Sequence, residues 1–334
     1  MVVLGTLASP GSPAMRPVLP VTGASAAFVE ARRPRALALG RALGDHVHDP
    51  ATLAAELRRA LVELADPDYV VSQRFVAPGI GLTHGVRNPL RDAVASGFRS
   101  ATRRASSSTL LAVADRLLRE AELEARWFAF GMLDRALERE PERTWQLLRR
   151  AAREAADWIT VDTLAHAMAL GIVAEPYRWA ELEQLVYAPS RWERRLVGST
   201  IATMPFASRS GGRAPGITAR ALPILANLVG DAEPDVQKAL AWAYRSMAVV
   251  DRPATTAALE HEADRAFAEA DGHRAWVVRD ALSKLDPEDA RRLHSRLDGL
   301  RRRPGTSSTS DAALTAARFA GLGLGGPITE PPLT

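Results

Sequence analysis

Apolar residues recur at spacings of three and four along most of the chain, the period expected for one buried face of an α-helix. The stretches ATLAAELRRALVEL from Ala51 and ERTWQLLRRAAREAA from Glu142 are clear examples. The pattern begins near Ser25 and predicts helices of about 12 to 20 residues, separated by breaks at Pro, Gly or Asp. No stretch has the convincing period-two alternation of a strand, so the sequence predicts an all-α protein.

The predicted helices follow one another through short links, which favours antiparallel neighbours and stacked helix pairs. These pairs recur at roughly 35 to 45 residues, the range of HEAT and related repeats. We therefore expect a HEAT-like solenoid, an α-α superhelix whose concave, basic face suits a rod-like partner such as DNA. The clearest predicted helices are 51–64, 109–119, 122–138, 142–156, 159–173, 179–187, 191–204, 218–228, 234–249, 254–270, 273–285 and 287–300.

The two ends of the chain differ from this helical body. Residues 1–24 carry several Pro, Gly and Ser residues without a helical period, so we interpret them as a flexible leader. Residues 25–300 form the expected repeat domain. Residues 301–334 are expected to begin as a linker (RRRPGTSSTS), to include a short helix over 311–320 and to end in a frayed tail.

The composition narrows the class of protein. A chain of 334 residues that is 47% hydrophobic and 25% charged is typical of a folded globular protein. It has no cysteine, which excludes disulfides, thiolate metal sites and a cysteine nucleophile. We expect no metal and no cofactor. The N-terminus lacks the basic start of a secretory signal, and no apolar run reaches the length of a membrane span, so we expect a cytoplasmic protein that does not contact membranes.

Arginine supplies almost all of the positive charge. Of 43 basic residues only Lys238 and Lys284 are lysines, and the formal net charge is +4. Two explanations remain open at this point. One is a coding bias toward arginine, and the other is a surface that binds phosphate groups in bidentate fashion.

Three predicted helices each carry a tryptophan with a charged residue one turn further on, so that both side chains share one face. One such pair is weak evidence, because a core tryptophan beside a solvated charge is common. Three in succession suggest a shared surface. The pairs are Trp158 with Asp162, Trp192 with Arg195, and Trp242 with Arg245.

The same helices carry sequence motifs that resemble those of a known family. They read DWITVDTLAHAMA from Asp157, SRWERRLVGSTIA from Ser190 and VQKALAWAYRSMA from Val236. In these motifs and in their order along the sequence, the chain resembles the DNA alkylation repair glycosylases of the AlkD type, which are built from HEAT-like repeats. Weaker similarity extends over about residues 65–285.

The resemblance implies roles for individual residues. Asp162 matches the family's catalytic carboxylate, and Trp158 and Trp242 match the two aromatic residues that flank the lesion. Arg195 matches a basic residue that reaches the DNA backbone. Further expected phosphate contacts are Arg245, Lys238, and Arg209 and Arg213 of the link at 208–216.

These residue types suit the removal of a cationic N3- or N7-alkylated purine. Cleavage of its bond to deoxyribose develops positive charge on the sugar, which a carboxylate stabilises. Indole faces attract a cation by about 0.5 to 2 kcal/mol. The resemblance implies that the lesion stays in the duplex, so that no deep base pocket is needed and bulky adducts are admissible substrates.

Two other functions remain open. One is a non-catalytic helical-repeat protein that holds distorted or branched DNA, although the presence of Asp162 speaks against it. The other is a HEAT-type protein-interaction scaffold in which the tryptophans are core residues. A monomer on double-stranded DNA is expected. Whether the substrates are methyl lesions or bulky adducts, and which base is preferred, stays undecided.

Overall fold

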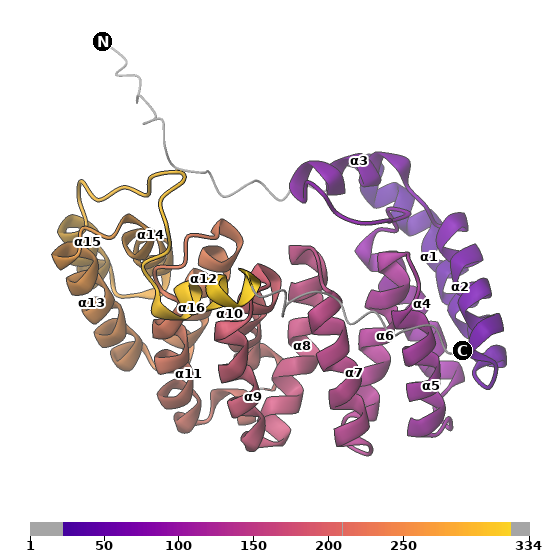
Figure 1. The fold of residues 1–334 in the computed structure, drawn as a ribbon. Helices are drawn as coiled ribbons and strands as arrows, with labels where there is room; N and C mark the ends of the chain where they lie inside the picture. Colours follow the sequence, from indigo (N-terminus) through magenta and orange to yellow (C-terminus); the bar gives the residue numbers. More distant parts are fainter. Residues whose placement is uncertain (1–22, 209, 322–334) are drawn as a thin grey trace, which may run out of the picture.

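The computed structural model describes residues 23–208 and 210–321. In these residues it contains sixteen α-helices and no strand (Figure 1). The first eight helices are α1 (Gly23–Leu43), α2 (Pro50–Glu63), α3 (Pro67–Val76), α4 (Asn88–Ala101), α5 (Ser107–Leu118), α6 (Leu123–Ala136), α7 (Pro141–Glu154) and α8 (Trp158–Ala174). The others are α9 (Trp179–Gln184), α10 (Arg191–Ala207), α11 (Pro215–Leu228), α12 (Pro234–Val250), α13 (Arg252–Ala268), α14 (Gly272–Ala281), α15 (Pro287–Arg296) and α16 (Asp311–Gly321).

The helices are stacked in two rows that form an arc (Figure 1). Along one row α1, α4, α6, α8, α10, α12 and α14 each pack against the next, and α2, α5, α7, α11 and α13 of the other row pack against members of the first. The arc opens toward the top of the view, between α3 and α14. The inner row consists of α1, α4, α6, α8, α10, α12 and α14, and the outer row of α2, α5, α7, α9, α11, α13 and α15. The expected all-α helical-repeat fold is confirmed.

Aspartates and prolines define where many helices begin. Asp49, Asp66 and Asp251 each precede a helix and accept a hydrogen bond from a backbone N–H of its first turn. Proline follows at the first or second position of these helices, where its missing N–H costs nothing. These Asp-Pro starts explain why the breaks predicted from sequence fall close to the observed helix boundaries.

Small residues let the inner helices approach closely. A Cβ atom built on Gly198 of α10 would lie 2.8 Å from the backbone carbon of Ala239 on α12. Only glycine therefore fits at this crossing. Since α10 also packs against α8, it lies closely packed between α8 and α12.

The end of the chain folds back onto the repeat body. Thr309 donates its backbone N–H to the Gly230 carbonyl at 2.9 Å, and the Ser308 hydroxyl accepts from the Ala232 N–H at 2.9 Å. Helix α16 then packs on α11. Within residues 23–208 and 210–321, no helix is long and apolar enough to cross a membrane. The expected leader and frayed tail fall largely on 1–22 and 322–334, outside the described residues.

Candidate functional site

The first turn of α8 is fixed by a buried hydrogen-bond network. Asp157 caps the helix by accepting from the backbone N–H of Thr160 at 2.8 Å and from its hydroxyl at 2.7 Å. The indole N–H of Trp127 on α6 donates to the same hydroxyl at 2.9 Å. These bonds orient the turn that carries Trp158, and Asp162 follows one turn later on α8.

Asp162 is held by two side chains of α10. Arg195 donates from Nε to Oδ1 at 3.1 Å and from Nη2 to Oδ2 at 2.7 Å, while the Ser199 hydroxyl donates to Oδ1 at 2.6 Å. The Asp162 side chain is 22% exposed and that of Arg195 only 6%. The bidentate pair therefore fixes the orientation of the Asp162 carboxyl group at the edge of solvent.

Arg195 links this carboxylate to the neighbouring aromatic residue and to α12. Its guanidinium carbon lies 5.8 Å from the centroid of the Trp158 ring, within the range of a cation–π contact. Its Nη1 donates to the backbone carbonyl of Asp235 at 2.6 Å, in the first turn of α12. Trp242 follows two turns after Asp235 on the same helix face and is partly buried against the core.

The hydrogen bonds of Asp162 are distributed unequally between its two oxygens. Oδ1 accepts from both Arg195 and Ser199, whereas Oδ2 accepts from Arg195 alone. A carboxylate oxygen has two acceptor positions, so Oδ2 retains one. In this partly exposed position it can accept a hydrogen bond from a water molecule or face a developing cation.

The expected phosphate-binding residues differ in their exposure to solvent and in whether a carboxylate lies close to their positive charge. The side chain of Lys238 is 58% exposed, and its ammonium lies 4.0 Å from the Asp235 carboxylate. Arg245 donates to the Asp280 carboxylate at 2.8 Å and is 27% exposed. Arg213 is exposed, and its Nε donates to the Pro205 carbonyl at 2.9 Å. Arg209 lies outside the described residues.

Ser199 belongs to the candidate site but was not predicted by the sequence analysis. It lies one helical turn after Arg195, so the two side chains necessarily share a face of α10. This spacing was visible in the sequence. A buried serine is common in a helix, however, and only the position of α8 beside α10 shows that its hydroxyl meets Asp162.

His166 lies one turn after Asp162 and contacts α6. Its Nδ1 is 3.2 Å from Oδ2 of Asp134. This hydrogen bond, with the charge of Asp134, raises the pKa of His166 above its ordinary value although partial burial acts in the opposite direction. A positive charge is thus favoured beside the candidate site.

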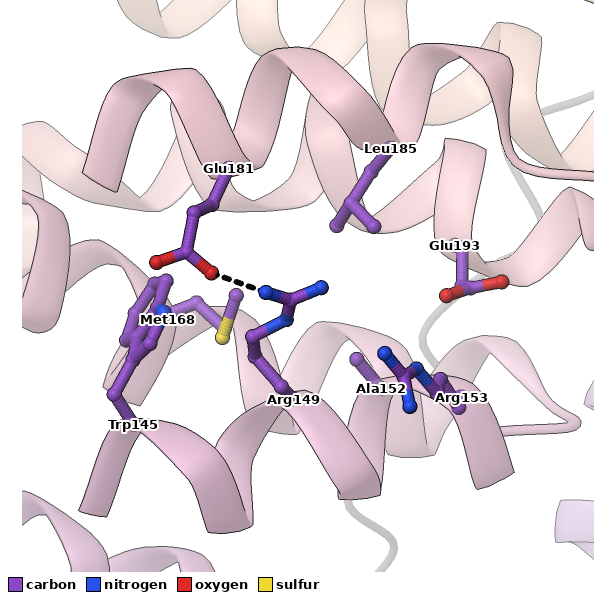
Figure 2. Close-up of a pocket in the computed structure, with 8 residues that line it drawn as sticks. All are labelled: Trp145, Arg149, Ala152, Arg153, Met168, Glu181, Leu185 and Glu193. Atoms are coloured by element: carbon purple, nitrogen blue, oxygen red, sulfur yellow. Dashed lines mark hydrogen bonds and ion pairs between the residues drawn. The ribbon is translucent and has the colours of Figure 1, made fainter. Parts of the chain in front are cut away.

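A small hollow between α7, α9 and α10 contains none of these residues (Figure 2). It encloses about 10 Å³, room for about one water molecule. Arg149 and Glu181 form an ion pair across it at 2.6 Å, and burial raises the pKa of Glu193 at its other end. A nucleobase does not fit there. No cluster of three metal-ligating side chains occurs in 23–208 or 210–321.

Comparison with known proteins adds one finding. The family model described as DNA alkylation repair enzyme matches residues 57–285, a span that includes α8, α10 and α12. Comparisons with curated proteins and with solved structures give no match. Because the family match covers more than half of the chain and all of the geometry around Asp162, the chain belongs to the family of DNA alkylation repair enzymes.

Proposed function

We propose that this protein is a monofunctional DNA glycosylase, acting as a monomer in the cytoplasm, that hydrolyses the N-glycosidic bond of N3- or N7-alkylated purines in duplex DNA. The observation that supports this most is the partly exposed Asp162 carboxylate on an inner helix, oriented by hydrogen bonds from Arg195 and Ser199. The products are a free base and an abasic site.

In this proposal Asp162 acts on the sugar rather than on the base. As the glycosidic bond breaks, positive charge develops on the deoxyribose, and the nearby carboxylate stabilises it electrostatically. The open acceptor position on Oδ2 orients the attacking water. Arg195 and Ser199 hold Asp162 in place, so that little reorganisation accompanies the reaction.

The two tryptophans bracket the cationic nucleotide. Trp158 lies one turn before Asp162, and Trp242 lies on α12, which Arg195 ties to the site through the Asp235 carbonyl. Their rings exclude water and attract the charged purine. The lesion stays in the duplex, without base flipping. Lys238, Arg245, Arg209 and Arg213 bind phosphates.

The direct test is the release of free base from duplex DNA carrying a single N7-methylguanine. Mass spectrometry identifies the released base, and alkali cleavage identifies the abasic site. We expect both products from the wild-type protein. A second duplex with a bulky N7 adduct separates a narrow from a broad substrate range.

The bidentate Arg195–Asp162 pair also suits a purely structural bond between α8 and α10. That arrangement favours the second candidate, a non-catalytic helical-repeat protein that binds distorted or branched DNA. Tight DNA binding without base release from either duplex would establish it. Absence of both binding and release would instead support a protein-interaction scaffold.

A further inference from the structure

A second basic feature lies at the other end of the inner row, where α1, α4 and α6 meet. It is a hollow of about 560 Å³, which we call the arginine hollow. Each of these helices contributes arginine near its C-terminal end. The hollow is lined by Arg41, Arg99, Arg103 and Arg135, with Ser96, Ser100 and Leu37.

The positive charge of the arginine hollow is not neutralised by the protein. Within residues 23–208 and 210–321, none of its four arginines forms an ion pair within 4.0 Å, whereas Arg194, Arg195 and Arg274 of the inner helices do. Arg135 is oriented by hydrogen bonds to the hydroxyl and carbonyl of Thr102, both at 3.0 Å. Burial, and then the charge of Arg99, lower the pKa of Arg135. A bound anion would relieve this repulsion.

The packing of α6 against α8 relates the position of the hollow to that of Asp162. His166 lies one turn after Asp162 on α8 and contacts Asp134 on α6 at 3.2 Å. Arg135 is the next residue of α6 and lines the hollow. With 1.5 Å of rise per residue and about 8–10 Å between packed helices, the hollow lies on the order of 20 Å from Asp162.

We propose that the arginine hollow binds backbone phosphates of the same DNA duplex, about six base pairs from the lesion at 3.4 Å of rise per base pair. The inference rests on the proposed DNA-directed function. It is supported by the absence of ion pairs at the four arginines, by the bidentate fit of guanidinium to phosphate, and by the contact between α6 and α8 that places the hollow near the helix of Asp162.

The decisive variant is the double substitution Arg99→Gln with Arg103→Gln in the full chain. Both side chains are exposed, so their loss does not open the core. The matched control is Arg143→Gln with Arg291→Gln, which removes from the outer helices α7 and α15 two exposed arginines that form no ion pair within 4.0 Å in the described residues. Both double variants change the net charge equally.

Fluorescence anisotropy with a long undamaged duplex, at several salt concentrations, measures affinity without requiring catalysis. Each phosphate contact adds about 0.9 to the slope of log affinity against log salt, so we expect the hollow variant to lose about two units of slope and about tenfold or more in affinity. The control should retain the wild-type slope. An unchanged slope in the hollow variant, or equal losses in both variants, would overturn the proposal.

Duplex length gives an independent test. Duplexes carrying one stable abasic-site analogue are trimmed from either end. Shortening the duplex on one side of the abasic-site analogue to less than about six base pairs should weaken DNA binding by the wild type but not by the hollow variant. Length-independent affinity would contradict the proposal. Base release from N7-methylguanine DNA is measured in parallel for the wild type and the Arg143/Arg291 control, which should release base equally, and its absence in the wild type would reject the glycosylase function alone.

Discussion

Arg195 binds both oxygens of Asp162, through Nε at 3.1 Å and Nη2 at 2.7 Å, and is itself almost completely buried. Its remaining group, Nη1, donates to the carbonyl of Asp235. All three nitrogens of the guanidinium are therefore engaged within the protein. In this structure Arg195 orients the carboxylate, whereas the resemblance to known glycosylases implies a contact to the DNA backbone.

This arrangement makes a specific prediction for Arg195→Gln. The variant loses the two charge-assisted bonds to Asp162, so the carboxylate is no longer fixed. We expect the single-turnover rate of base release to fall by about tenfold to a hundredfold, the usual result of misplacing a catalytic group. Equilibrium binding to undamaged DNA should change little. Arg195→Lys should recover only part of the rate, because lysine lacks the planar fork.

For Lys238 we expect weaker DNA binding with an unchanged rate of base release, the opposite of the result for Arg195→Gln. Its ammonium is exposed one turn before Trp242 and is not buried in an ion pair. If it contacts a phosphate, Lys238→Gln lowers the slope of log affinity against log salt by about one, while the rate at saturating protein is unchanged. Titrations at a series of salt concentrations measure both quantities. A changed rate at saturation would place Lys238 at the reacting centre instead.

A buried ion pair beside the site predicts a large effect on stability. Nε of Arg194 and Oδ2 of Asp231 are 2.8 Å apart, with side-chain exposures of 8% and 0%. Asp231→Asn leaves the arginine charge buried without its partner. We expect the free energy of unfolding to fall by about 3–5 kcal/mol, as measured by urea denaturation.

The control for this variant is the same substitution in an exposed pair. Arg252 and Asp286 are 2.9 Å apart, but their side chains are 52% and 59% exposed. Asp286→Asn should leave the stability almost unchanged. Similar losses in the two variants would show that burial is not the deciding factor.

His166 gives a prediction for the dependence of stability on pH. Its pKa is raised above 6.5 by Asp134, so the folded state holds the proton more tightly than the unfolded state. The resulting stability is fully present below about pH 6.5 and is lost as pH rises through the raised pKa. At about pH 5.5 the wild type should therefore have a higher melting temperature than the His166→Gln variant. This difference in melting temperature should vanish by about pH 8.5. Asp134→Asn should remove the same dependence, and a difference that grew with pH would contradict this account.

The helices that flank Asp162 were predictable from sequence, whereas the contacts between them were not. The predicted span 191–204 corresponds to α10 (Arg191–Ala207), which begins after the capping Ser190. It continues through Pro205 because tertiary packing overrides the usual stop signal. The predicted span 159–173 likewise corresponds to α8 (Trp158–Ala174).

The partner of each charged residue depends on how neighbouring helices align, and no local pattern contains that information. Spacing within a helix pairs Trp192 with Arg195, but the packing of α10 on α8 directs Arg195 to Trp158 and Asp162. Trp192 instead contacts Arg191, whose guanidinium carbon is 4.7 Å from its ring centroid. The arginine hollow was not foreseen for the same reason, since Arg41, Arg99 and Arg135 are far apart in sequence.

The central claim concerns Asp162, and Asp162→Asn tests it most directly because asparagine preserves the shape of the side chain and removes its charge. The measurement is single-turnover release of 7-methylguanine from duplex DNA by the wild type and the variant, with DNA affinity determined in parallel. We expect the variant to bind DNA with near wild-type affinity and to release base at least about a hundredfold more slowly. Release at the wild-type rate by the variant would contradict the assignment of Asp162 as the catalytic carboxylate.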